Sequence, residues 1–234
     1  FIGVLAFSKQ RPMDKLNKGL SQRVNLAGVR YALQLLTTKR RHAIPHVAVK
    51  NISSIDWKAV KASGYKGCVF DKDNTLTNPY SMCFHPLVKD SMKECVEAFE
   101  GKVVLLSNSA GLFQYDPKGE EADAIEKKLG IPVLRHKKKK PAGEPAALEN
   151  HFKAETSQLV MVGDRTFTDV AYGNAMGMLT IRCDPFTSKG ENFFVKLARC
   201  LEALLVKVLR VLGCRPPDQK LLATPDRALT FVKA

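Results

Sequence analysis

Five short apolar runs, separated by segments of helical periodicity, constrain the fold of this chain more than any other feature. The runs span residues 65–70, 102–108, 132–135, 158–164 and 179–183. The helical segments between them span residues 86–100, 119–129, 144–153 and 168–176. Strands without polar alternation, separated by helices, are typical of a parallel sheet buried on both faces. Right-handed crossovers then predict a doubly wound α/β sheet.

Polar residues follow three of these runs at the point where each run ends. Asp71 follows the first run, Ser107 and Asn108 end the second, and Asp164 ends the fourth. In open α/β sheets, ligands bind beyond the carboxyl ends of the strands. We therefore expect these side chains to share one crevice.

The segment 71–77 (DKDNTLT) carries two carboxylates two residues apart, Asp71 and Asp73. A carboxylate held in line with a phosphate can attack phosphorus and form an acyl phosphate. A second carboxylate beside it can protonate the leaving oxygen and later take a proton from water. Taken alone, this spacing is equally compatible with a solvated turn.

A second acidic segment, 163–169 (GDRTFTD), follows the fourth run and directs Asp164 toward the same crevice. Converging carboxylates need a cation, because like charges at close range do not all stay ionised. Oxygen ligands beside a phosphate favour Mg²⁺. The structural alternative is an N-cap for the next helix, a role that suits Thr168 or Asp169 better than Asp164.

Ser107, Asn108 and a lysine beside Pro141 complete the expected site. A hydroxyl and backbone N–H groups at a strand end can hold phosphoryl oxygens, and a lysine can neutralise the charge that develops during transfer. Lys140, adjacent to Pro141, is the best candidate in the run that begins at Lys137. For the other three lysines, a solvated loop is an equally good interpretation.

The order DxDxT, Ser at a strand end, Lys-Pro and GDxxxxD resembles the four motifs of haloacid-dehalogenase-like phosphatases. The matching residues are Asp71, Asp73, Thr75, Ser107, Lys140, Asp164 and Asp169. The resemblance implies that Asp71 is the nucleophile, that Asp73 is the general acid/base and that Lys140 assists them. It implies Mg²⁺ held by Asp71, Asp164 and the backbone carbonyl of Asp73, with support from Asp169. Phosphate contacts are expected from Thr75, Ser107 and Asn108.

The intervals between these motifs leave no room for a cap domain. Residues 78–106 separate the first motif from Ser107, and residues 108–139 separate Ser107 from Lys140. Each interval must already hold a helix and a strand. An open site suits a large substrate that covers the crevice itself, such as a lipid head group, a protein or a nucleic-acid end.

The sequence around the motifs resembles the mitochondrial and plastid phosphatidylglycerophosphate phosphatases. The similar segments are DKDNTLTNPY, LLSNSAG, RHKKKKPAG, MVGDRTFTDVAYGN, NLAGVRYAL and IPHVAVKNISSIDW. The resemblance implies hydrolysis of phosphatidylglycerophosphate to phosphatidylglycerol, a step toward cardiolipin, with Lys72 near the head group or balancing local charge. It implies a peripheral location on the matrix side of the mitochondrial inner membrane, or in a plastid. The alternative is a capless phosphatase of phosphoproteins or nucleic-acid ends.

The net charge of +14 predicts attraction to a polyanion. With this family resemblance we expect an anionic phospholipid surface and no nucleic acid. No stretch approaches the roughly 20 apolar residues of a spanning helix, so no transmembrane span is expected. Residues 191–212 are expected to form a basic amphipathic helix that either packs on the core or lies on a membrane surface.

These features divide the chain into three expected parts. They are an N-terminal helical, membrane-associating segment 1–44, a phosphatase domain 45–190, and a basic amphipathic helix with its tail 191–234. Within the first part, residues 21–37 have an apolar helical face, whereas the proline-containing tail 213–234 is expected to be irregular. Because the chain begins with Phe1 rather than Met, we expect any targeting segment to lie outside it.

Overall fold

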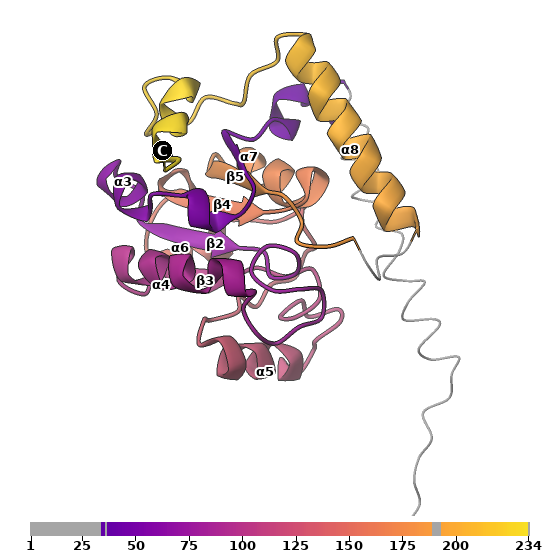
Figure 1. Ribbon diagram of the computed structural model, residues 1–234. Helices are drawn as coiled ribbons and strands as arrows, with labels where there is room; N and C mark the ends of the chain where they lie inside the picture. Colours follow the sequence, from indigo (N-terminus) through magenta and orange to yellow (C-terminus); the bar gives the residue numbers. More distant parts are fainter. Residues whose placement is uncertain (1–33, 36, 189–192, 234) are drawn as a thin grey trace, which may run out of the picture.

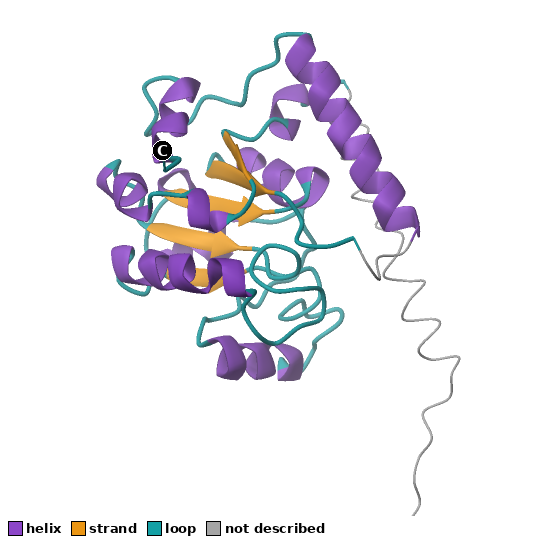
Figure 2. Cartoon of the chain, in the orientation of Figure 1, coloured by secondary structure: helices purple, strands orange, loops and turns teal. Residues whose placement is uncertain are grey.

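A parallel five-stranded sheet forms the centre of the computed structural model, which describes residues 34–233 except 36 and 189–192 (Figure 1, Figure 2). The strands are β1 (Val47–Val49), β2 (Gly67–Phe70), β3 (Val103–Leu105), β4 (Leu159–Gly163) and β5 (Leu179–Cys183). They lie in the order β1-β5-β4-β2-β3, and every neighbouring pair is parallel. The expected doubly wound α/β sheet is confirmed.

Helices cover both faces of the sheet because neighbouring residues of a strand point to opposite sides. Cys68 and Phe70 of β2 belong to one hydrophobic cluster, and Val69 between them belongs to another. The first cluster includes residues of α3 (Trp57–Ala62), α4 (Lys89–Ala98) and α5 (Glu120–Leu129). The second includes residues of α6 (Pro145–Phe152) and α7 (Ala171–Ala175). Uninterrupted apolar strands are therefore buried on both sides, as the sequence indicates.

The strand order reverses between β2 and β4, and this reversal places the site. From β2 the chain crosses to β3 at one edge, and then returns to β4 on the other side of β2. Connections that leave in opposite directions open a crevice beyond the carboxyl ends of the two strands. Asp71 directly follows β2 and Asp164 directly follows β4. The fold thus directs both residues to the same crevice.

One expected strand is wrong, and a different segment provides the fifth strand. Residues 132–135 form only an isolated bridge between Leu105 and Val133. The ladder stops at the end of this segment, because the Arg135 side chain binds the carbonyl oxygen of Val133 and the next residue, His136, pairs with Leu112 instead. The fifth strand is β1, at the opposite edge beside β5. Its three residues are too few to show a periodicity.

The remaining helices follow their expected segments with small shifts. The segment 168–176 becomes a π-helical turn, η5 (Thr166–Val170), followed by α7. The segment 191–212 contains α8 (Phe193–Val211). The tail is not irregular throughout, because a 3₁₀ helix, η6 (Pro225–Phe231), buries Ala228 and Phe231 in the first cluster. The expected helix over 21–37 lies almost wholly outside the described residues.

No helix among the described residues is long and apolar enough to cross a membrane. The described chain between β2 and β4 also holds no inserted domain. It consists of loops, the single turn η3 (Pro86–Val88), α4, β3, α5, α6 and the turn η4 (Thr156–Gln158). The capless arrangement expected from the motif spacing is therefore present.

Candidate active site

The loop that follows β2 holds Asp71 at the end of the sheet. The Asp71 amide donates to the carbonyl oxygen of Val162 at 2.8 Å, which continues the β2–β4 pairing by one residue. The loop then closes on itself, because the amides of Leu76 and Thr77 both donate to the Lys72 carbonyl at 3.0 Å. Asn74 takes the left-handed conformation (φ 62°) that this closure requires and that asparagine tolerates. The DKDNTLT segment is thus a fixed turn and not a solvated one.

Three carboxylates converge at the ends of β2 and β4. Asp71, Asp164 and Asp169 each place one oxygen so that these atoms all lie within 4.8 Å of one another. The Lys140 ammonium joins them, with Nζ 2.8 Å from Asp71 Oδ1 and 2.6 Å from Asp169 Oδ1. Lys140, Asp164 and Asp169 are buried, whereas the Asp71 side chain keeps 16% of its surface exposed. A substrate phosphate can therefore reach Asp71 more readily than the groups beneath it.

Burial and mutual repulsion raise the pKa of two of these carboxyl groups. Desolvation is the largest cause for Asp71, whose pKa rises to about 6 although Lys140 opposes the shift. Desolvation and the charge of Asp71 raise the pKa of Asp164 to about 7. Burial alone would lower the pKa of Lys140, but Asp169 and Asp71 outweigh it and raise that pKa. The cluster holds more negative charge than its resident cations comfortably neutralise.

Gly163 lets Asp169 approach the end of β4. A Cβ at position 163 would lie 2.4 Å from both Cβ and Cγ of Asp169, closer than any real contact. Asp169 Oδ2 also accepts from the Arg165 amide at 3.0 Å, and the Asp169 amide donates to the Arg165 carbonyl at 3.0 Å. The spacing of the GDxxxxD segment is explained by this reciprocal turn.

Asn108 connects the end of β3 to the lysine loop. Its Oδ1 accepts from the Lys140 amide at 2.8 Å, and its Nδ2 donates to the Lys140 carbonyl at 3.4 Å. The ring of His136 supports the same region, because its two nitrogens lie 2.8 Å from the carbonyl oxygens of Ser107 and Lys138. These contacts fix the backbone from which the Lys140 side chain reaches Asp71. The sequence singled out Asn108 and Lys140 but gave no signal for His136.

The remaining predicted site residues occupy the same loops. Lys72 is buried, and its ammonium donates to Asp73 Oδ1 at 2.5 Å and to the Ser81 carbonyl at 3.0 Å. Asp73 Oδ1 also accepts from the backbone amide of Tyr80 at 2.9 Å. Lys72 therefore balances the charge of Asp73 in this structure.

Two hydroxyl groups of the site differ in their hydrogen bonding. Ser107 Oγ lies 3.2 Å from the hydroxyl of Ser109 and accepts from the Ser109 amide at 3.2 Å. Thr75 is fully buried, and within the described part of the chain its hydroxyl has no hydrogen-bond partner. A buried hydroxyl without a partner is costly and indicates a place where a ligand or water completes the site.

Two residues of α8 reach the site from the far end of the chain, and the motif pattern did not indicate them. Arg199 Nη2 lies 2.6 Å from Asp164 Oδ2. Glu202, which is 4% exposed, accepts from the Arg165 guanidinium at 2.8 and 3.1 Å and from the Thr166 amide at 2.9 Å. A single glutamate within the otherwise basic 193–211 stretch was the available signal.

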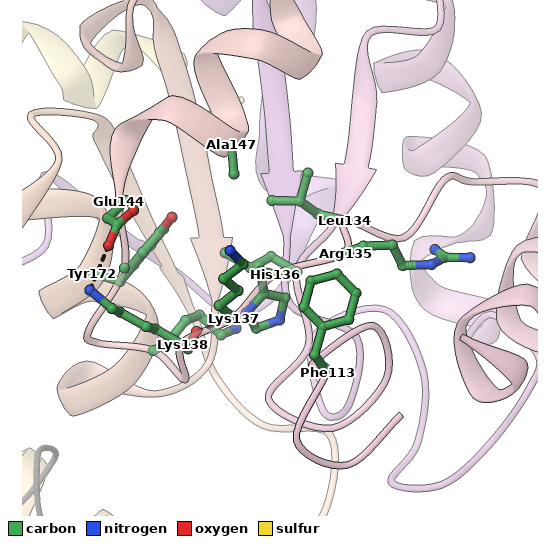
Figure 3. A pocket seen from close by; sticks show the side chains of 12 residues that line it. Phe113, Leu134, Arg135, His136, Lys137, Lys138, Glu144, Ala147 and Tyr172 are labelled. Carbon is green, nitrogen blue, oxygen red and sulfur yellow. Dashed lines mark hydrogen bonds and ion pairs between the residues drawn. The ribbon is translucent and has the colours of Figure 1, made fainter. Parts of the chain in front are cut away.

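A cavity of about 220 Å³ lies behind the Lys140 loop. It is lined by Leu106, Phe113, Leu134, Arg135, His136, Lys137, Lys138, Lys140, Gly143, Glu144, Ala147 and Tyr172. Figure 3 shows the ion pair of Lys138 with Glu144 beside Tyr172, with Lys137 next along the same loop. Lys140 is shared with the carboxylate cluster, but none of the three carboxylates lines this cavity. Lys137 and Lys138 thus line a cavity that meets the carboxylate cluster only through Lys140.

The carboxylate cluster fits a divalent cation. Its three converging ligand groups are oxygens only, two of them with pKa values raised by burial and by their neighbours. A hard cation such as Mg²⁺ takes carboxylate ligands of this kind beside a phosphate. Asp71, Asp164 and Asp169 are therefore the residues that could hold it.

In comparisons with known proteins, the chain is similar to phosphatidylglycerophosphate phosphatases. A family model described as mitochondrial PGP phosphatase matches residues 26–186. Phosphatidylglycerophosphate phosphatase 1, chloroplastic, of Chlamydomonas reinhardtii is 48% identical over 92% of this chain and 79% of its own length. The chloroplastic/mitochondrial phosphatidylglycerophosphate phosphatase 1 of Arabidopsis thaliana is 42% identical over 94% of this chain, which spans 63% of that protein. A probable mitochondrial phosphatidylglycerophosphatase of Schizosaccharomyces pombe is 31% identical over 66% of this chain and 79% of its own length.

Proposed function

Because the chain belongs to the mitochondrial PGP phosphatase family, we propose that it hydrolyses phosphatidylglycerophosphate to phosphatidylglycerol and phosphate through an aspartyl phosphate on Asp71. It is a phosphatase of phospholipid biosynthesis. The observation that carries the mechanism is the position of Asp71 at the strand reversal, within 2.8 Å of the buried Lys140 ammonium. No other carboxylate of the cluster combines this position with an exposed side chain.

The reaction proceeds in two displacements at phosphorus. In the first, an Asp71 oxygen attacks the terminal phosphate, the bond from phosphorus to the glycerol oxygen breaks, and Asp73 donates a proton to that oxygen. In the second, Asp73 takes a proton from water, the water oxygen attacks phosphorus, and the bond to Asp71 breaks. Phosphate leaves and the Asp71 carboxylate is restored.

Several residues orient the phosphate and balance its charge in this proposal. Lys140 neutralises the charge that develops on the phosphoryl oxygens, and Asn108 holds the Lys140 backbone in place. Ser107 and Thr75 offer hydroxyl groups to the phosphate. Lys72 keeps Asp73 in position through their ion pair.

Asp71, Asp164 and Asp169 would hold Mg²⁺, together with the backbone carbonyl of Asp73. The ion, when bound, supplies positive charge to the phosphate and to the converging carboxylates. The dense negative charge of the cluster supports this proposal, and Arg199 and Lys140 offset only part of it.

The open site supports a substrate that stays in its membrane. We propose peripheral attachment to an anionic phospholipid surface, in a mitochondrion or a plastid, with the phosphatase domain 45–190 presented to the head groups. The net charge of +14 supplies the attraction, and α8 offers an exposed apolar face. Lys137 and Lys138 line the cavity that shares Lys140 with the carboxylate cluster, and they would meet the second, diester phosphate of the lipid.

The test is phosphate release from vesicles that contain phosphatidylglycerophosphate, with and without Mg²⁺. We expect Mg²⁺-dependent release that disappears in Asp71→Asn, which keeps the shape of the side chain and removes the nucleophilic carboxylate. Asp90→Asn, the same change at an exposed aspartate of α4, serves as the matched control. Unchanged release by Asp71→Asn would refute the covalent mechanism.

The capless site also admits a second substrate class, the phosphoproteins and nucleic-acid ends. Turnover of a phosphopeptide and of a 3′-phosphorylated oligonucleotide, compared with the lipid at equal concentration, separates the two. We expect the lipid to be preferred, and a higher kcat/KM on either soluble substrate would reassign the enzyme.

A further inference from the structure

Helix α8 carries two functional faces on opposite sides. Its outer face consists of large apolar side chains at helical spacing that are between 45% and 81% exposed, namely Phe193, Leu197, Leu201, Leu204, Val208 and Val211. Its inner face packs Leu205 and Leu209 against the cluster that contains Ala171 and Ile44. The inner face therefore packs on the core, and the outer face stays available for contact with a membrane.

The outer face has the chemistry of a bilayer contact. A contiguous row of exposed apolar side chains is unusual on a soluble surface and marks an interaction site. Exposed Lys196, Lys207 and Arg210 accompany this row, and the whole chain is strongly cationic. Anionic lipid head groups complement such cations while the apolar row enters the boundary of the acyl chains.

The inner face makes polar contacts with the loop that follows β4. Arg199 pairs with Asp164, and Glu202, one turn further on, binds both the Arg165 side chain and the Thr166 amide. The helix α8 also contacts η5, the turn that contains Asp169. Figure 1 shows α8 standing at the edge of the sheet above the loops at its carboxyl end. Any displacement of α8 must therefore move the partners of two proposed metal ligands.

We propose that α8 couples membrane contact to the active site: its outer face docks on an anionic bilayer, and its inner face, through Arg199 and Glu202, positions the 164–169 loop. The inference rests on the proposed lipid phosphatase function and adds a regulation of the same site. Arg199 and Glu202 are positioning residues, because they act through Asp164, Arg165 and Thr166. A bilayer that binds α8 while Arg199 and Glu202 keep their contacts favours the observed conformation of the 164–169 loop. By reciprocity, ligands that order this loop must favour bilayer binding to the same extent.

The direct test uses a soluble substrate, so that access to lipid plays no part. Turnover of p-nitrophenyl phosphate by the full chain is measured with and without phosphatidylcholine vesicles that contain phosphatidylglycerol. We expect the vesicles to raise kcat/KM about 5-fold or more, within the usual range of coupling between two sites. Mn²⁺ titration followed by electron paramagnetic resonance should show a matching increase in metal affinity, a readout independent of turnover.

Variants on the two faces separate binding from coupling. Leu201→Ser with Leu204→Ser should weaken vesicle binding about 10-fold or more, since each leucine loses apolar contact, and should remove the stimulation. Glu202→Gln should still sediment with vesicles but should lose both the stimulation and the gain in Mn²⁺ affinity. Arg199→Lys, a milder change, should retain part of both. Leu229→Ser alters a similarly exposed leucine on η6 and should change neither vesicle binding nor the stimulation of turnover.

Three results would overturn the coupling. One is vesicle binding that leaves soluble turnover and Mn²⁺ affinity unchanged in the wild-type protein. Another is stimulation that survives in Glu202→Gln or in Arg199→Lys at full strength. The third is an outer face that is buried between two copies of the chain, which Leu201→Ser with Leu204→Ser would reveal as a change in oligomeric state with vesicle binding intact. Failure of the proposed function would appear differently, as wild-type protein that does not release phosphate from the lipid.

Discussion

Lys140→Met tests whether one buried ammonium holds the carboxylate cluster together. Lys140 is 1% exposed, and its Nζ contacts Asp71 at 2.8 Å and Asp169 at 2.6 Å. Methionine preserves most of the side-chain volume but removes the charge from a site that also contains Asp164. Breaking a buried ion pair on one side costs about 3–5 kcal/mol of stability. For a domain of this size, that loss lowers Tm by about 6–20 °C.

The assay is thermal unfolding in the presence of a chelator, so that no metal ion replaces the missing charge. Trp57, the single tryptophan of the chain, is buried and reports unfolding by its fluorescence. Lys137→Met, at an exposed position in the same run, is the matched control and should change the stability by less than about 0.5 kcal/mol. Phosphate release should fall about 100- to 1000-fold in Lys140→Met, by loss of charge stabilisation in the transition state.

The loss of stability in Lys140→Met should depend on pH through the ionisation of Asp71 and Asp164. The pKa values of Asp71 and Asp164 in the folded protein, about 6 and about 7, lie above the ordinary aspartate value of 3.8. Ionisation of these groups therefore costs stability as the pH rises from the ordinary value through the folded values, and Lys140 offsets part of that cost. The difference in Tm between wild type and Lys140→Met should be largest above pH 7 and should shrink as the pH falls toward 4. Equal Tm values above pH 7 would refute the assignment of Lys140 to the cluster.

Three further outcomes follow from other contacts. Gly163→Ala should abolish phosphate release, because the new Cβ would lie 2.4 Å from Asp169 Cγ. The control Gly130→Ala has no atom near its Cβ and should cost only the strain of its positive φ. Circular dichroism and phosphate release distinguish the two variants. Asp116→Asn should destabilise the fold by about 1–3 kcal/mol, because Asp116 accepts from three backbone amides that outweigh burial and hold its pKa below the usual range. The difference in unfolding free energy between wild type and Asp116→Asn should be present above pH 3.8 and should be lost as the pH falls through the pKa of Asp116 in the folded protein. Chemical unfolding at several pH values measures it. Vesicle sedimentation should weaken as salt rises from low ionic strength, because the attraction to anionic lipid is screened.

The position of the carboxylate cluster could be predicted from the sequence because two of its members, Asp71 and Asp164, lie at strand ends within local motifs. Asp71 and Asp164 directly follow apolar strands, and in a parallel sheet those ends share one edge. The motif spacing also predicted the absence of a cap, since the intervals are filled by a helix and a strand or its equivalent. Local pattern and tertiary position coincide at these residues, so little beyond the topology was needed.

The contributions of β1 and α8 could not be predicted in the same way. Three residues make up β1, and its identity as a strand depends on pairing with β5, which lies more than 130 residues later. The helical pattern of α8 showed an apolar stripe, but which side faces the core depends on tertiary docking. Leu205 and Leu209 turned inward with Glu202, while Leu201 and Leu204 remained outside.

The burial of the cluster explains how a site without a cap can still support strong electrostatics. A cap normally excludes water when it closes, which strengthens each charge interaction inside. Here Lys140, Asp164 and Asp169 are between 1% and 4% exposed before any substrate binds. Only Asp71, with 16% of its side chain exposed, opens toward the surface. In the proposed mechanism, a lipid head group therefore has to cover Asp71 and the Asp73 side chain, which is 38% exposed, and a membrane surface against the crevice would do so without a moving domain.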